Sequence, residues 1–304
     1  MSKKYTKPIL KWVGGKTQII DKIISLFPRI IENYYEPFLG GGSVLLALLD
    51  EIQKNNIIIK GEIIVNDINQ NIINLYKQIQ DNPDQLINNL DLLINQFNKC
   101  EEDNGNKKPI NKNEAYESKE SYYYWIRKQF NETNERNTSE IAALTLFLNK
   151  TCFRGLYREG PNGFNVPYGN YKHPQIYNKK HILQISKIIQ NVKFLNTSYE
   201  NILNNIRNNS FIYLDPPYAS ENNKSFVSYT NNGFSFNDHN KLFQLCDKIN
   251  NHNLFLLSNS NTKYVLDYFN DKYVIEIIVT KRSINSKDPS SKTKEVLIKN
   301  YYIQ

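Results

Sequence analysis

The sequence predicts an α/β protein in which a parallel sheet is interrupted by a long, mainly helical insertion. Apolar stretches with strand character alternate with amphipathic helical stretches in residues 30–79 and again in residues 192–302, and this alternation is typical of parallel sheets. Between about residues 77 and 178 it gives way to helical periodicity and a segment punctuated by Gly and Pro. We therefore expect a discontinuous sheet domain, residues 1–76 and 179–304, and an inserted domain, residues 77–178.

The first part of the chain contains two units in which a strand leads through a loop into a helix. Residues 30–37 predict a strand that runs into three consecutive glycines, and residues 43–52 predict a helix with a serine near its start as a cap. Residues 57–65 predict a second strand, which ends just before Asp67, and residues 70–79 predict an amphipathic helix. Both loops should lie at the carboxyl edge of one sheet.

The remaining elements follow from the same patterns. In the insertion we expect a polar helix and then a charged loop in residues 81–112, helices in 121–130 and 139–148, and loops with a hairpin in 153–174. Five further strands should complete the sheet; they are residues 192–195, 211–214, 254–258, 273–279 and 296–302. The hydrophilic residues 280–294 predict a surface loop.

The composition is that of a globular protein, with 304 residues of which 40% are hydrophobic and 22% charged. A formal net charge of +8 favours an anionic partner such as nucleic acid, although proteins that bind no such partner commonly have a similar charge. Three widely spaced cysteines indicate a reducing, cytoplasmic environment. The four histidines show no metal-ligand spacing and are expected to be solvated, so we expect no metal site. We also expect neither a signal peptide nor a membrane span.

A chemical site is predicted where the strand of residues 211–214 ends. Asp215, Pro216, Pro217 and Tyr218 follow that strand directly. Because two prolines prevent further ladder pairing and keep the backbone extended, the Asp carboxylate, the prolyl carbonyl and the Tyr ring should be fixed at the sheet edge. Ligands bind at such edges in open α/β sheets.

A second part of the site is predicted at the glycine loop. Residues 36–42, Glu-Pro-Phe-Leu-Gly-Gly-Gly, let the backbone approach a nucleoside closely, although a tight turn without a ligand would have the same composition. Asp67 should lie beside this loop, where it can accept the hydroxyl groups of a ribose, or it can cap the helix that follows. The spacing lacks the third glycine of the dinucleotide fingerprint.

Several segments in one order carry a resemblance to a known family. They are residues 10–16, 36–43, 66–69, 149–158, 164–169, 215–218, 258–259 and 281–284. Together they resemble the Dam-type (D12 class, alpha group) site-specific DNA adenine-N6 methyltransferases. The resemblance implies a Rossmann-like catalytic domain, an inserted target-recognition domain, S-adenosyl-L-methionine as cofactor and double-stranded DNA as substrate.

The resemblance also implies roles for particular residues. Lys16 would lie near the methionyl carboxylate of the cofactor, Asp67 on its ribose and Asp215 near its amino acid end. The implied cofactor-binding residues are Trp12, Gly14, Gly15, Lys16, Glu36, Pro37, Phe38, Gly40, Gly42, Ser43, Asp67, Ile68 and Asp215. The implied catalytic residues are Asp215, Pro216, Pro217 and Tyr218, which would hold an adenine amino group.

For DNA recognition, the family pattern implies the palindrome GATC. Arg158 would read a guanine, Leu156 and Pro167 a thymine methyl group, Phe153 would insert at the flipped base, and Lys11 would contact the outer guanine. The full implied DNA-binding set is Lys11, Phe153, Arg154, Leu156, Arg158, Pro167, Asn170, Lys172 and Arg282.

Two positions depart from the Dam branch, which has asparagine where this chain has Arg154 and arginine where it has Asn170. In the family pattern these two positions belong to the contacts with the orphan base and the flanking phosphates. Phe226 and Tyr229 could close over the flipped base or pack under their loop.

Alternatives of other classes remain open on the sequence. Methylation of cytosine N4 shares the exocyclic-amine chemistry, a DNA-binding module could lack catalysis, and a nicotinamide-dependent oxidoreductase could use a similar sheet. A methyltransferase of this kind could act beside a restriction endonuclease on the same site without a stable complex, or in epigenetic marking. We expect a monomer or a weak dimer.

Overall fold

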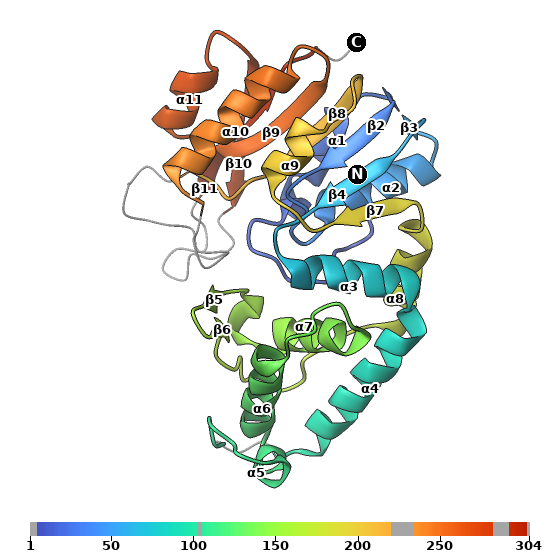
Figure 1. Ribbon diagram of the computed structural model, residues 1–304, viewed down its shortest axis with the longest axis vertical. Coiled ribbons are helices and arrows are strands. Elements are labelled where there is room, and N and C mark those ends of the chain that lie inside the picture. The colour runs from blue at the N-terminus through green and yellow to red at the C-terminus, as the bar shows by residue number, and fades with distance from the viewer. Residues whose placement is uncertain (1–4, 102–104, 220–233, 282–291, 303–304) are drawn as a thin grey trace.

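The structure is a computed structural model that describes residues 5–101, 105–219, 234–281 and 292–302. Its centre is a seven-stranded sheet with the order β10-β11-β9-β8-β2-β4-β7 (Figure 1). The strands are β2 (Asn33–Glu36), β4 (Ile63–Asn66), β7 (Val192–Leu195), β8 (Ser210–Leu214), β9 (Leu254–Ser260), β10 (Val274–Lys281) and β11 (Lys292–Lys299). This mixed α/β sheet, parallel in most of its pairs, agrees with the expected fold class.

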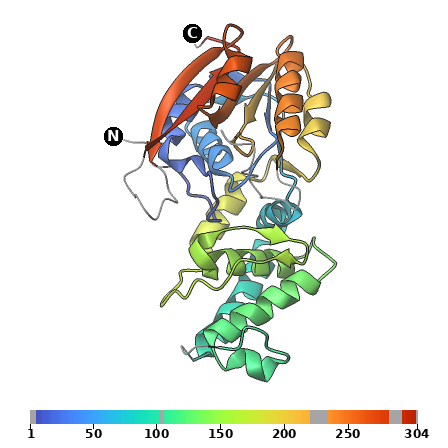
Figure 2. The ribbon, with the colours of Figure 1, turned by 90° about the vertical axis from the view of Figure 1, so that its left-hand side faces the viewer.

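The sheet separates two hydrophobic cores because neighbouring residues of a strand point to opposite faces. In β8, Phe211 and Tyr213 belong to one core, whereas Ile212 and Leu214 belong to the other. The first core includes residues of α1 (Ile20–Ser25), α2 (Ser43–Gln53), α3 (Gln70–Asp81) and α8 (Lys179–Ile188). The second includes residues of α9 (Tyr199–Asn204), α10 (Phe236–Ile249) and α11 (Lys263–Phe269), and α9 and α10 lie together on one side in Figure 2.

Residues between α3 and α8 form the lower part of the molecule in Figure 1. They contain α4 (Pro83–Lys99), α5 (Lys112–Tyr116), α6 (Lys119–Glu132), α7 (Ser139–Thr151), the short 3₁₀ helix η2 (Phe153–Gly155) and a hairpin of β5 (Glu159–Gly160) and β6 (Gly163–Phe164). Leu90 of α4 and Phe147 of α7 share the first core with Tyr76 of α3. Helices α4, α6 and α7 therefore pack on the sheet through one continuous apolar cluster.

Two of the expected strands are each divided in the structure. Residues 30–37 form β1 (Ile30–Ile31) and β2, and residues 57–65 form β3 (Ile58–Ile59) and β4; β1 and β3 pair in a separate two-stranded sheet. The division occurs at a turn at Gly61, whose N–H donates to the Glu32 carbonyl at 2.7 Å, while the Asn33 side chain accepts from the Glu62 N–H at 3.0 Å. An added Cβ at Gly61 would lie 2.4 Å from Asn33 Oδ1, so the turn requires glycine.

Three further expectations are corrected. β11 begins at Lys292 and runs antiparallel to both neighbours, so the expected strand 296–302 is displaced and the sheet is not wholly parallel. Gly42, with φ 74°, occupies the N-cap of α2, and the Ser43 hydroxyl instead accepts from the Lys16 N–H at 3.2 Å. His239 is buried in α10, and burial lowers its pKa to about 4.

Among the described residues, none of the helices combines the length and the apolar character needed to cross a membrane. The same part of the chain contains no group of three or more His, Cys, Asp or Glu side chains placed to hold a metal ion.

Candidate active site

The loops after β2, β4, β7 and β8 enclose a cavity of about 740 Å³. Its size is that of a site for a small-molecule ligand or cofactor. Most of the residues expected at the site line this cavity; they are Trp12, Gly14, Gly15, Lys16, Pro37, Phe38, Gly40, Ser43, Asp67, Ile68, Asp215, Pro216, Pro217 and Tyr218. The structure therefore brings four of the segments that carry the family resemblance to one place. They are the amino-terminal motif (residues 10–16), the glycine motif (36–43), the acidic motif (66–69) and the Asp-Pro-Pro-Tyr motif (215–218).

Lys16 connects the amino-terminal motif to the Asp-Pro-Pro-Tyr motif. It lies in the short 3₁₀ helix η1 (Lys16–Gln18) and is only 4% exposed. Its ammonium group lies 2.9 Å from Asp215 Oδ1 and 4.7 Å from the centre of the Tyr218 ring, and it donates to the Gly14 carbonyl at 2.7 Å. Lys16 is thus a buried ion-pair partner rather than an exposed lysine at a helix start.

The ionisation of Asp215 is set by two opposing effects. The pKa of this carboxyl group is raised to about 6 because the raising effect of burial exceeds the lowering effect of the adjacent Lys16 ammonium. Since a carboxyl group in an apolar pocket favours the neutral form, the ammonium keeps Asp215 ionised near neutral pH. An ionised carboxylate accepts hydrogen bonds and donates none, which suits it to hold an N–H group of a ligand.

Tyr218 is held at its hydroxyl end. That hydroxyl donates to Glu295 Oε2 of β11 at 2.7 Å. Burial and the nearby carboxylate of Asp215 raise the pKa of Tyr218 well above its ordinary value, so the phenol stays neutral. Held at one edge, the ring offers a fixed surface for a planar ligand.

Asp67 joins the glycine loop to the start of α3. Its Oδ2 accepts from the Gly40 N–H at 2.8 Å, and its Oδ1 accepts from the Asn69 N–H at 2.9 Å. Asn69, not Asp67, caps α3, because its side chain accepts from the N–H groups of Asn71 and Ile72. The pKa of Asp67 is raised to about 6 because the raising effect of burial exceeds the lowering effect of the two amides.

Two of the expected cofactor residues do not line the cavity. Glu36 is 2% exposed, accepts from the Tyr34 hydroxyl at 2.8 Å, and has a pKa raised well above its ordinary value by burial. Gly42 faces Tyr76: a Cβ there would lie 2.3 Å from the Tyr76 hydroxyl. Packing against Tyr76 accounts for this glycine. By contrast, Gly40 lies against the cavity residue Trp12, whose ring an added Cβ would approach to 3.0 Å.

The expected DNA-binding residues gather around η2 and the neighbouring segment. The Phe153 N–H donates to the Pro167 carbonyl at 2.8 Å, and Phe153 is 44% exposed. The Arg154 guanidinium lies over the Phe153 ring at 5.2 Å, and Arg154 has a left-handed φ of 56°. These two side chains are therefore presented together on the surface.

Lys11 is attached to this group by Asn149 of α7. The Asn149 side chain accepts from the Lys11 N–H and donates to the Lys11 carbonyl, both at 2.8 Å, and donates to the Gly155 carbonyl at 3.2 Å. The Lys11 ammonium lies 4.8 Å from the centre of the Tyr171 ring. The amino-terminal segment and the η2 loop thus form one surface.

The remaining expected DNA-binding residues extend this surface. Arg158 is exposed, and its Nε donates to Asn165 Oδ1 at 2.6 Å across the β5–β6 hairpin. Leu156 is partly exposed, whereas Pro167, Asn170 and Lys172 are exposed. Arg282, Phe226 and Tyr229 lie outside the described residues.

Other cavity residues were missed by the sequence reasoning. Ser198 and Tyr199 follow β7 and line the cavity, so the rule that identified Asp67 and Asp215 would also have found them. Phe234 and Asp238 enter from the start of α10, and Glu159 enters from the β5–β6 hairpin. No local signal distinguishes these three residues, because their place depends on how distant segments pack.

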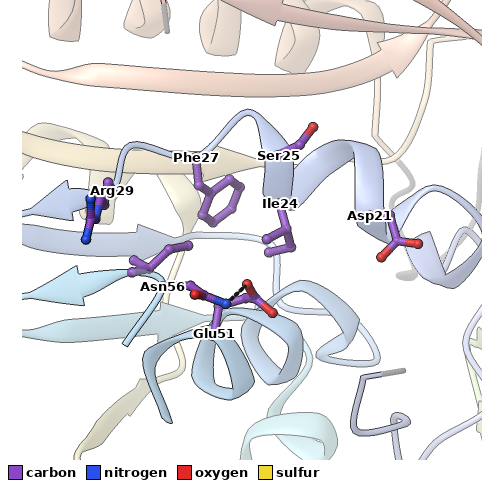
Figure 3. Close-up of a pocket in the computed structure, with 8 residues that line it drawn as sticks. Asp21, Ile24, Ser25, Phe27, Arg29, Glu51 and Asn56 are labelled. Atoms are coloured by element: carbon purple, nitrogen blue, oxygen red, sulfur yellow. Dashed lines mark hydrogen bonds between the residues drawn. The ribbon is translucent and has the colours of Figure 1, made fainter. Parts of the chain in front are cut away.

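A second, more open cavity of about 440 Å³ lies beside α1 and the end of α2 (Figure 3). Its buried acid, Glu51, accepts from Asn56 Nδ2 at 2.9 Å and from Lys54 Nζ at 3.1 Å. These contacts are local and stabilise the turn that ends α2.

Comparison with known proteins agrees with this geometry. The sequence pattern of the D12 class N6 adenine-specific DNA methyltransferases matches residues 12–284. The chain is 37% identical to the Type II methyltransferase M.MjaIII of Methanocaldococcus jannaschii, over 97% of this chain and 99% of that protein. It is 30% identical to the Type II methyltransferase M1.LlaDCHI of Lactococcus lactis subsp. cremoris (97% and 95%) and 28% identical to the DNA adenine methylase of Haemophilus influenzae (96% and 92%). The chain belongs to the D12 class of N6 adenine-specific DNA methyltransferases.

Proposed function

We propose that this protein transfers the methyl group of S-adenosyl-L-methionine to N6 of an adenine flipped out of a short double-stranded DNA site, GATC. The observation that carries the proposal is the ion pair between Lys16 and Asp215, which connects the Asp-Pro-Pro-Tyr motif to the cavity that would hold the cofactor. Family membership supports the reaction class.

The donor groups of the cavity fit this cofactor. Asp67 offers a carboxylate to ribose hydroxyl groups at one part of the wall, and Asp215 with Lys16 offers opposite charges to an amino acid group at another. Gly14, with φ 80° and nothing within 4 Å of an added Cβ, leaves open space beside Lys16. The cofactor supplies an activated methyl group on a sulfonium, so the protein has mainly to position the two reactants.

The adenine amino group is a weak nucleophile because its lone pair is delocalised into the ring. The Asp215 carboxylate and the Pro216 carbonyl can each accept one of its N–H groups, which favours a nitrogen with a localised lone pair. The Pro216-Pro217 pair keeps this edge rigid, and Pro216 is buried. Asp215 must be ionised to act in this way.

Flipping the base costs a few kcal/mol. Stacking on an aromatic ring is worth about 1 to 3 kcal/mol per base and offsets much of that cost. We assign this stacking to Tyr218, whose hydroxyl bond to Glu295 fixes the ring; the base would lie on the face opposite the Lys16 ammonium. Phe153, which is half-exposed, would fill the space that the base leaves in the duplex.

We propose that residues 77–178 form the target-recognition domain and that residues 1–76 and 179–304 form the catalytic domain. The gathering of Phe153, Arg154 and Pro167 within residues 77–178 supports this division. Arg158 would read guanine bidentately in the major groove, and Leu156 with Pro167 would contact the thymine methyl group. Helix α3 continues to Asp81, across the first boundary, and so would connect the two domains rigidly.

The test is to sequence modified bases in DNA coexpressed with the protein and to identify the product by mass spectrometry. We expect N6-methyladenine in GATC. Asp215→Asn should retain DNA binding and lose transfer, whereas the control Asp84→Asn, at the exposed start of α4, should change neither. N4-methylcytosine would refute the proposed reaction, and adenine methylated in another context would refute the assigned sequence.

We further propose that the protein protects DNA in a restriction-modification system. Two of the compared relatives are named Type II methyltransferases, which supports this role. DNA modified by the protein should resist an endonuclease that N6-methyladenine in GATC blocks. Complete cleavage of such DNA would refute the protective role.

A further inference from the structure

The β5–β6 hairpin presents neighbouring side chains to two different places. Arg158 is exposed on the surface proposed to contact DNA, whereas Glu159, the next residue, lines the cavity proposed for the cofactor. Arg158 directly precedes β5 and its carbonyl accepts from the Asn165 N–H at 3.1 Å, so the extended segment continues through it. Successive residues of an extended segment point to opposite sides, which explains this division. A movement of this segment must therefore affect both side chains.

Glu159 is held in the cavity wall by a hydrogen-bond network. The Tyr157 hydroxyl donates to Glu159 Oε1, and Asn71 Nδ2 donates to the Tyr157 hydroxyl at 2.9 Å and to Glu159 Oε1 at 3.5 Å. Tyr157 is 7% exposed, and its ring packs on Trp12 with the ring centres 5.3 Å apart. Both hydrogen bonds that Glu159 accepts, from Tyr157 and from Asn71, end on its Oε1 atom, which leaves Oε2 for a donor in the cavity.

The same network leads to Asp67. Asn71, which contacts Tyr157 and Glu159, donates through its N–H to the Asn69 side chain, and the Asn69 N–H donates to Asp67 Oδ1. Glu159 and Asp67 therefore lie at the same part of the cavity. Each oxygen of Asp67 already accepts one backbone amide, from Gly40 or from Asn69. A second carboxylate beside it suits a ligand with two hydroxyl donors, as a ribose is.

We infer that Glu159 is a positioning residue that accepts a ribose hydroxyl of the cofactor and thereby couples cofactor binding to the placement of Arg158 on DNA. The inference rests on the proposed function. Binding of either ligand would fix the extended segment that carries both side chains, so each ligand should raise the affinity for the other by the same factor.

The decisive variant is Glu159→Gln, which keeps an acceptor for the Tyr157 hydroxyl but removes the charge. The control is Glu132→Gln on α6, which makes the same charge change at an exposed side chain. Binding of S-adenosylhomocysteine is measured by calorimetry in the absence of DNA. Since hydrogen bonds to charged groups are the stronger ones, we expect Glu159→Gln to weaken binding roughly tenfold and the control to stay within about twofold.

A cofactor analogue without ribose hydroxyl groups identifies the atoms involved. The native protein should lose more affinity for this analogue, relative to S-adenosylhomocysteine, than Glu159→Gln does, because the variant already lacks one of the bonds. Equal losses would overturn the assignment to ribose. Native affinity in Glu159→Gln would overturn the inference as a whole.

Coupling is measured as the affinity for a GATC duplex with and without S-adenosylhomocysteine. The gain given by the cofactor should be smaller in Glu159→Gln than in the native protein; an equal gain would refute the coupling. If Glu159→Gln does not fold, Tyr157→Phe is the deciding variant. Loss of the hydroxyl that anchors Glu159 should weaken cofactor binding several-fold. Unchanged cofactor binding in Tyr157→Phe would overturn the inference. A native protein that does not bind the cofactor would instead refute the proposed function.

Discussion

Replacing Lys16 by methionine should move the pH dependence of methyl transfer. In the native protein burial raises the pKa of Asp215 to about 6, and Lys16, 2.9 Å away, opposes that rise. Transfer requires ionised Asp215, so the rate should fall as pH falls through about 6. Without Lys16 the pKa of Asp215 is higher, so the rate should already fall at higher pH.

The size of the effect follows from the ion pair. An opposite charge at this distance typically lowers a carboxyl pKa by about 1 to 3 pH units, and we expect the acid limb to move toward alkaline pH by roughly one unit or more. Removing one partner of a buried pair costs about 3 to 5 kcal/mol of stability, reduced here because the Asp215 side chain is 19% exposed. This loss should shrink below pH about 6, where Asp215 becomes neutral in both proteins.

The assay is single-turnover transfer from about pH 5 to 9 with DNA and cofactor saturating, so that weaker cofactor binding does not enter the rate. Lys22→Met, which removes an exposed ammonium that pairs with Glu276, is the matched control and should leave the profile unchanged. An acid limb at the same pH in Lys16→Met and the native protein would show that Lys16 does not set the ionisation of Asp215.

Other substitutions test the loops around the cavity. Gly42→Ala should lower the free energy of unfolding, measured with urea, by about 2 to 5 kcal/mol, because φ is 74° and the new Cβ would meet the Tyr76 hydroxyl. Gly14→Ala should lower it by only about 1 to 2 kcal/mol, because φ is 80° but the space around the new Cβ is open. Equal losses would contradict the packing argument. Arg154→Asn should keep or raise the melting temperature, since asparagine tolerates a φ of 56°, and weaken DNA binding at low salt. Because the pKa of Asp67 is raised to about 6, its contribution to the free energy of unfolding should fall by on the order of 1 to 3 kcal/mol as pH rises from about 4 to 6. The measurement compares the free energies of unfolding of the native protein and Asp67→Asn over this pH range. A difference between the two proteins that does not change with pH would refute this prediction.

The parts of the fold that local patterns determine were predicted well. Strand β7 occupies the expected residues, and Asp215 follows β8 as the run of apolar residues and the two prolines indicate. The direction of β11 was wrong because an apolar run does not encode whether its neighbours are parallel. The division at Gly61 was missed because it depends on Asn33, which is distant in sequence.

The same distinction holds for the site. The motifs of Asp67 and Asp215 lie in the cavity, as strand ends in one sheet require. The pairing of Lys16 with Asp215 was not predicted, because it joins the amino terminus to the second half of the chain. His239 was expected to be solvated, yet α10 buries it against Phe243 and Phe234, and a single histidine in a polar helix carries no signal of that contact.

The two departures from the Dam pattern are related through the structure. Arg154 and Asn170 lie on segments joined by the bond from the Phe153 N–H to the Pro167 carbonyl, and both have positive φ, 56° and 50°. Asparagine adopts this conformation readily, whereas arginine there is uncommon. Compared with the Dam pattern, the arginine and the asparagine stand at each other's positions in two adjoining segments, so the charge of the surface is the same and the guanidinium lies beside Phe153. The left-handed φ of Arg154, next to the half-exposed Phe153, is the kind of backbone strain that clusters at ligand-binding sites, and it supports the proposed contact of this loop with DNA.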